Sequence, residues 1–147
     1  MTAHEIDDLA GRFQSQAISR AEWTHLAHLT VGAWHVHHFG AEAALERLRD
    51  GIRRLNERNG VMNSSRSGYH ETITRAYVVL LAEYLGAFPE IVPVHERIGA
   101  IAGDVLAEKD LLLRHYSKNR LMSSDARAQW VEPDLQPLRL RQPPEQP

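Results

Sequence analysis

Histidine residues offer the clearest chemistry in this sequence. Nine of its 147 residues are histidines, and five of the nine lie between residues 19 and 39. His25 and His28 are three residues apart, a spacing that places two side chains on the same face of a helix. This face also carries Leu29, which indicates that it turns toward the protein interior. An unpaired imidazole is costly there, so the pair indicates either metal ligands or core histidines hydrogen-bonded to backbone or carboxylate groups.

His70 is the third candidate ligand. The string HETIT at residues 70–74 resembles the HExxH helix of zinc enzymes, but Thr74 occupies the position that the second histidine requires. His70 shares a helical face with apolar residues, so it would complete a three-histidine site with His25 and His28 across two antiparallel helices. Three imidazoles and a water molecule form a common catalytic zinc site, and imidazole also binds iron and nickel. We therefore predict a divalent metal ion, zinc, iron or nickel, bound by His25, His28 and His70.

Two glutamates lie close to these histidines in the sequence. Glu71 is the predicted catalytic residue, acting as a general base. It could also be a fourth ligand, hydrogen-bond to a ligating imidazole, or form an ion pair with Arg75 one helical turn later. Glu22 precedes His25 by three residues, but it also forms a capping box with Ser19, and the capping box is the preferred explanation for it.

The elements that must position these residues are helices. The chain is predicted to be all-α, a helical bundle of about five to six helices with an extended C-terminal strap. A capping box of Thr2 and Glu5 begins the first helix. Residues 19–39 form the central helix, which begins at the capping box of Ser19. Residues 68–86 form the other long helix, and its apolar face predicts that it packs against the central one.

The C-terminal segment is predicted to be a strap instead of a helix. Two prolines between residues 130 and 138 exclude regular helix there. Its apolar side chains are expected to be buried against the bundle, because a long exposed apolar row is uncommon on a soluble monomer; they are Trp130, Leu135 and Leu138. Residues 1–140 are thus predicted to form a single domain, and residues 141–147 a mobile proline-rich tail.

The composition narrows the classes of function. The formal net charge of −2 gives no electrostatic argument for binding nucleic acid or an anionic membrane. No apolar run approaches the roughly 18 residues needed to span a bilayer. The chain has no cysteine, so it has neither disulfides nor thiolate chemistry. We expect a cytoplasmic protein with a small-molecule substrate and no nucleic-acid or membrane partner, either a monomer or a homodimer.

Three motifs support a family resemblance. They are EWTHxxH at residues 22–28, GYHETIT at 68–74 and WVEPDLxPL at 130–138. Together they resemble a bacterial family of helical bundles. A bundle with three histidines on facing helices is in turn similar to the DinB/YfiT-like metal-binding superfamily. The resemblance implies a divalent metal ion within a helical bundle.

The leading functional prediction is a small metal-dependent enzyme that acts on a small molecule. The metal would polarise the substrate or activate water or oxygen, which leaves hydrolase, transferase and oxygenase chemistry open. The first alternative is a non-catalytic helical protein, monomeric or dimeric, whose histidines are structural or sense pH. The second is a metal-binding regulator without turnover.

Overall fold

The computed structural model describes residues 1–140, so the predicted tail at 141–147 lies outside the described residues. Within the described part, the chain forms seven α-helices and three short 3₁₀ helices and contains no β-strand. The predicted all-α class is confirmed. The α-helices are α1 (Ala3–Gln14), α2 (His25–Phe39), α3 (Ala41–Arg58), α4 (Glu71–Gly86), α5 (Val94–Gly99), α6 (Lys118–Leu121) and α7 (Ser124–Ala128).

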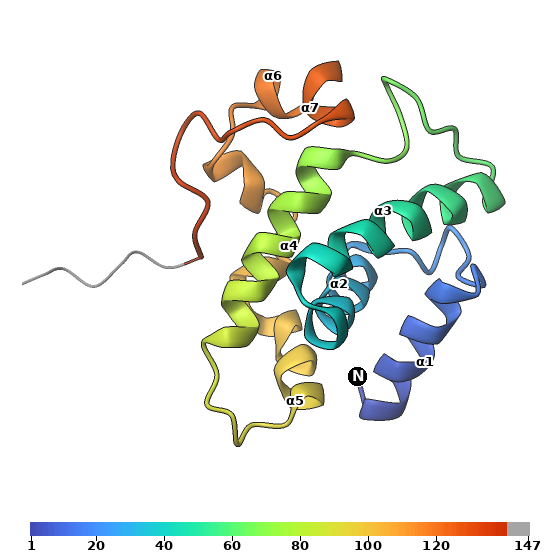
Figure 1. Cartoon of the computed structure of the whole chain (residues 1–147), viewed down its shortest axis with the longest axis vertical. Coiled ribbons are helices and arrows are strands. Elements are labelled where there is room, and N and C mark those ends of the chain that lie inside the picture. Colours follow the sequence, from blue (N-terminus) through green and yellow to red (C-terminus); the bar gives the residue numbers. More distant parts are fainter. Residues whose placement is uncertain (141–147) are drawn as a thin grey trace, which may run out of the picture.

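Helix α2 is the central element, with α1, α3, α4 and α5 packed around it (Figure 1). Its sequence explains this position, because Leu29 and Val31 are both buried although they point to nearly opposite sides of the helix. A helix that is hydrophobic on all sides must be covered by its neighbours. The buried hydroxyl of Thr30 donates to the Leu26 carbonyl oxygen at 2.8 Å and is therefore satisfied.

Helices α2, α3 and α4 pack against one another pairwise, and the predicted contact between α2 and α4 is confirmed. Helix α4 runs along the molecule, from α7 near its beginning to α5 near its end (Figure 1). A cavity lies between α2, α3 and α4, the three longest helices of residues 1–140. No helix in residues 1–140 has the combination of length and hydropathy that crossing a bilayer demands.

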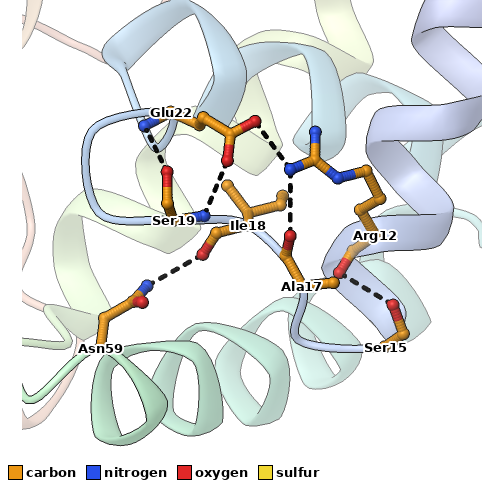
Figure 2. Close-up of polar contacts among 7 residues, drawn as sticks. All are labelled: Arg12, Ser15, Ala17, Ile18, Ser19, Glu22 and Asn59. Carbon is orange, nitrogen blue, oxygen red and sulfur yellow. Dashed lines mark hydrogen bonds and ion pairs between the residues drawn. The ribbon is translucent and has the colours of Figure 1, made fainter.

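Helix α2 begins at His25, not at Ser19 as predicted. Thr24 is its N-cap and accepts a hydrogen bond from the backbone N–H of Ala27 at 3.2 Å. Ser19 and Glu22 do form their reciprocal pair: Ser19 N donates to Glu22 Oε1 at 3.1 Å, and Glu22 N donates to Ser19 Oγ at 3.3 Å (Figure 2). The pair closes a turn instead of a helix, because the Thr24 N–H bonds back to the Glu22 carbonyl at 2.9 Å and the chain changes direction there.

The C-terminal strap, residues 129–140, lies against α4. The hydroxyl of Thr72 joins the two segments, because it donates to the Gln129 carbonyl at 2.9 Å and accepts from the Val131 N–H at 3.2 Å. Two of the three apolar side chains predicted to pack on the bundle do so and are partly buried; they are Trp130 and Leu138.

The predicted burial of Leu135 is wrong, since this side chain is 56% exposed. Its backbone explains the difference. The Leu135 N–H donates to the His115 carbonyl at 2.9 Å, and the neighbouring Asp134 carboxylate accepts from the Ser117 N–H at 2.8 Å. These bonds fix the backbone at residues 134 and 135 and leave the Leu135 side chain in solvent. Leu135 also lies an odd number of positions from both Trp130 and Leu138, so the alternation of side chains along an extended segment places it on the opposite side.

Candidate ligand-binding pocket

A cavity of about 380 Å³ lies between α2, α3 and α4. Most of its wall is apolar, and its polar groups come from the first turn of α2, from α4 and from a lysine at position 109. Burial by three helices and a mainly apolar wall with few polar groups are typical of small-molecule sites. The lining residues are Trp23, His25, His28, Leu29, Gly32, Leu48, Ile52, Ile73, Thr74, Tyr77, Val78, Leu81 and Lys109.

Gly32 allows α2 and α4 to approach each other closely at this wall. A Cβ atom at this position would lie 2.9 Å from Leu81 Cδ1, which is shorter than a van der Waals contact. Leu81 is almost fully buried, so it has little room to move away. The absence of a side chain at Gly32 therefore sets the width of the cavity on this side.

His28 lies at the pocket wall, and within residues 1–140 one of its ring nitrogens forms no hydrogen bond. Its Nδ1 lies 2.7 Å from the Thr24 carbonyl oxygen, and its ring lies against Trp23 with 3.8 Å between the ring centroids and a 34° angle between the ring planes. Because a carbonyl only accepts, Nδ1 carries the hydrogen and Nε2 of the neutral ring keeps its lone pair. Desolvation by the surrounding protein lowers the pKa of His28 to about 4. His28 is partly reached by water, which weakens the desolvation. The lowered pKa still favours the neutral ring at pH 7.

His25 and Tyr77 face the same cavity. The His25 Nε2 lies 3.1 Å from the Leu106 carbonyl oxygen, so the neutral ring keeps its lone pair on Nδ1. The ring of Tyr77 meets that of His25 edge to face at 5.5 Å. Burial raises the pKa of Tyr77 to about 12, so its hydroxyl remains a hydrogen-bond donor. Within residues 1–140, no side chain or backbone group bonds to this hydroxyl.

His70 is placed differently from the other two candidate ligands. It is the N-cap of α4, and its Nδ1 accepts from the Ile73 N–H at 3.1 Å. The helix predicted for 68–86 therefore begins at Glu71. The Nε2 atom of His70 lies 2.7 Å from the Leu121 carbonyl oxygen and must donate to it, so both ring nitrogens of His70 are used. In this arrangement His70 offers no lone pair to a metal ion.

The three predicted ligands are not gathered around one point. His25 and His28 line the cavity between the long helices, whereas His70 lines an adjacent hollow together with His28. Across residues 1–140, no group of three or more histidine, aspartate or glutamate side chains is placed to hold a metal ion. The three-histidine metal site stays a prediction, and it would require His70 to give up its cap or its bond to Leu121.

Glu71, the predicted general base, belongs to an ion pair. Arg49 donates to both of its carboxylate oxygens, at 2.8 and 2.7 Å, and the Tyr69 hydroxyl donates to Oε1 at 2.7 Å. These bonds, with the one from Arg49 the strongest influence, lower the pKa of Glu71. Glu71 is not among the residues that line the cavity or the adjacent hollow. The alternative pairing with Arg75 is wrong, because that guanidinium lies over the Trp130 ring instead.

Glu22 stabilises the segment between α1 and α2. Besides its two bonds with Ser19, its carboxylate accepts from the Arg12 guanidinium at 2.7 Å, and the same guanidinium donates to the Ala17 carbonyl at 3.0 Å (Figure 2). The Asn59 amide, at the end of α3, donates to the Ile18 carbonyl at 3.0 Å. Glu22 is therefore structural, as the capping box predicts.

Several pocket residues were not singled out from the sequence. Tyr77 and Thr74 share a helical face with His70, and that face could have identified them. No local signal identifies Lys109 or Arg127 of the adjacent hollow, because these residues come from distant parts of the chain.

Comparisons of the chain with protein-family models, with curated proteins and with solved structures find no match. The resemblance to DinB/YfiT-like bundles therefore stays a prediction.

Proposed function

We propose that this protein binds a small, largely apolar molecule in the cavity between α2, α3 and α4. The observation that carries the proposal is an apolar cavity of about 380 Å³ whose wall, besides the exposed Lys109, includes three polar groups with hydrogen-bonding capacity that no group in residues 1–140 uses. These groups are His25 Nδ1, His28 Nε2 and the Tyr77 hydroxyl. An apolar pocket with a few convergent polar groups is the usual form of a small-molecule site.

The polar groups define what the ligand must offer. In its neutral form each imidazole accepts one hydrogen bond, and the Tyr77 hydroxyl donates one. A ligand with an apolar body, a hydroxyl or amine donor and one acceptor would satisfy all three. A purely hydrocarbon ligand would leave these groups without partners, which costs binding free energy.

The second candidate function is a metal-dependent reaction of a small molecule in the same cavity. It is favoured by the position of His25 and His28 on one wall, each with a ring nitrogen that no other group in the described residues 1–140 uses. Such a site needs a third ligand, and His70 could supply one only after losing a hydrogen bond. Elemental analysis of protein purified without a histidine tag tests this candidate. Near-stoichiometric zinc, iron or nickel would support it, and its absence would contradict it.

Binding of the neutral fluorescent probe N-phenyl-1-naphthylamine tests the pocket itself. We expect saturable binding by the wild-type protein. Ile52→Phe adds bulk to the cavity wall and should weaken the affinity by at least about tenfold, as changes of this size in apolar pockets do.

Leu45→Phe is the matched control. Leu45 lies on the same helix, is also partly buried, and does not line the cavity. The melting temperature of each variant separates loss of binding from loss of folding. Equal affinities of both variants and the wild type would contradict a site between α2, α3 and α4.

A further inference from the structure

The cavity adjoins a second, more polar hollow. This hollow has a volume of about 540 Å³ and lies near the ends of α3 and α7 and the beginning of α4. The two spaces lie against each other, because five side chains line both of them. The shared residues are Trp23, His28, Ile52, Ile73 and Thr74. A ligand that occupies both spaces would have to pass between these side chains.

Two arginines and no carboxylate line the second hollow. Arg20 is exposed and lies in the turn before α2, and Arg127 belongs to α7. Within residues 1–140, neither arginine forms an ion pair with an acidic side chain. The hollow is therefore positively charged, whereas the protein as a whole is slightly negative.

Arg127 keeps donors available for a ligand. Its Nη1 donates to the Gly68 carbonyl at 2.9 Å and makes a longer contact of 3.4 Å with the Tyr69 carbonyl. A guanidinium has five N–H groups, so most of them remain unused. The two carbonyl bonds also orient the side chain, and an oriented guanidinium loses less conformational entropy when it binds an anion.

Arg20 is carried by a turn that is held at both ends. Ser19 and Glu22 bond reciprocally on either side of it, and the Arg12 guanidinium holds the Glu22 carboxylate at 2.7 Å (Figure 2). The Asn59 bond to Ile18 ties the beginning of this turn to α3. Glu22 is the acidic residue nearest to Arg20 in the sequence. Arg12 already neutralises its charge, so Glu22 does not compete with an anionic ligand for Arg20.

From this juxtaposition we infer that the ligand of the cavity is an amphipathic anion, whose apolar body lies beside His28 and Tyr77 and whose carboxylate, sulfonate or phosphate group lies between Arg20 and Arg127. This inference rests on the proposed function, because it assigns the ligand class of the same cavity. Guanidinium groups bind anionic oxygens through paired, charge-assisted hydrogen bonds.

Two probes that differ only in the anionic group test the inference. They are 1-anilinonaphthalene-8-sulfonate and the neutral N-phenyl-1-naphthylamine, which has the same ring system without the sulfonate. The wild type is expected to bind the sulfonate more tightly than the neutral probe. Arg20→Gln should weaken sulfonate binding about tenfold, the usual size of one charge-assisted hydrogen bond, and leave the neutral probe unaffected. Arg127→Gln should have the same effect.

Arg139→Gln is the matched control, because it removes one exposed positive charge from a residue that lines neither space. Arg127→Gln also removes two backbone contacts, so its melting temperature is measured alongside. The Arg20 side chain makes no hydrogen bond or ion pair within residues 1–140, and Arg20→Gln is therefore decisive if Arg127→Gln does not fold.

The outcomes separate the inference from the proposed function. If the neutral probe binds and Ile52→Phe weakens it, but the sulfonate shows no preference, the amphipathic-anion inference is overturned and the proposed pocket stands. If Arg139→Gln weakens sulfonate binding as much as Arg20→Gln, the attraction is general and the inference is also overturned. If neither probe binds, both proposals fall.

Discussion

The Nε2 atom of His70 lies 2.7 Å from the carbonyl oxygen of Leu121, so one imidazole ties the beginning of α4 to the end of α6. The other nitrogen of the same ring caps α4 through the Ile73 N–H. His70 thus joins two segments that are 51 residues apart in the sequence. Both ring nitrogens of His70 therefore form hydrogen bonds within the protein.

His70→Ala is expected to lower the free energy of unfolding by about 2–4 kcal/mol, because it removes a helix cap and leaves a buried carbonyl without its partner. His70→Asn should lose less, since asparagine is a good N-cap residue. Urea unfolding with and without EDTA checks this. If EDTA reduces the stability of the wild type to that of His70→Ala, His70 is a metal ligand and the structural explanation is contradicted.

The stability of the protein is expected to fall as the pH decreases below about 6.5. Burial lowers the pKa of His35 and of His70 from the ordinary value near 6.5. Between that value and the lower folded-state values, the unfolded chain binds protons that the folded protein does not. Acid therefore favours unfolding. The stability that the neutral rings contribute is fully present above about pH 6.5 and decreases as the pH falls toward the folded-state pKa values.

Melting temperatures measured between pH 8 and pH 5 check this pH dependence. The carboxylate of Glu71, whose pKa is lowered, affects stability only below its ordinary pKa near 4.3 and does not interfere. His70→Asn should make the curve less steep, because it removes one of the rings whose pKa burial lowers. A constant melting temperature over this range would contradict the assignment of neutral buried histidines.

Glu71 is expected to matter for stability through Arg49. Glu71→Gln should cost about 1–3 kcal/mol, because the Glu71 side chain is only 12% exposed and the substitution leaves the Arg49 guanidinium without its charged partner. Arg49→Met should cost a similar amount, and the double variant should cost clearly less than the sum. Strictly additive costs in urea unfolding would mean that the two residues do not stabilise each other.

Gly32→Ala is expected to destabilise the protein and to narrow the cavity. The added methyl group would lie 2.9 Å from Leu81 Cδ1 in a packed wall, and overpacking of this kind costs about 1–3 kcal/mol. The matched control is Gly11→Ala in α1, where a Cβ atom has no neighbour within 4 Å. That change should stabilise by about 0.5–1 kcal/mol, because alanine favours helix. Equal effects of the two substitutions would contradict a tight wall at Gly32.

The C-terminal strap should contribute to stability through Trp130 and not through Leu135. Trp130→Ala removes a partly buried ring that packs on the core and lies under the Arg75 guanidinium at 4.6 Å, so we expect a loss of at least about 1 kcal/mol. Leu135→Ser should change stability by less than about 0.5 kcal/mol, because that side chain is exposed.

Truncation after Gln129 should lower the melting temperature. An unchanged melting temperature would mean that the strap does not stabilise the bundle.

The sequence by itself determined the elements that depend on neighbouring residues. The Thr2–Glu5 capping box begins α1 as predicted, and α4 ends at Gly86, where the predicted helix ends. The stretch at residues 19–39 is central as predicted, although its helix begins only at His25. Caps and helical faces follow from residues three or four positions apart, so a pattern in the sequence contains the information.

Only the tertiary structure decided which partners the functional side chains meet. Glu71 pairs with Arg49, which lies 22 residues earlier, and not with Arg75 one turn away. His70 faces Leu121 instead of His25, and Arg127 joins the hollow from the far end of the chain. The Ser19–Glu22 pair forms its bonds without beginning a helix, because Thr24 caps α2. These outcomes depend on how separate helices pack, and local spacing carries no information about which distant groups satisfy a buried donor or charge.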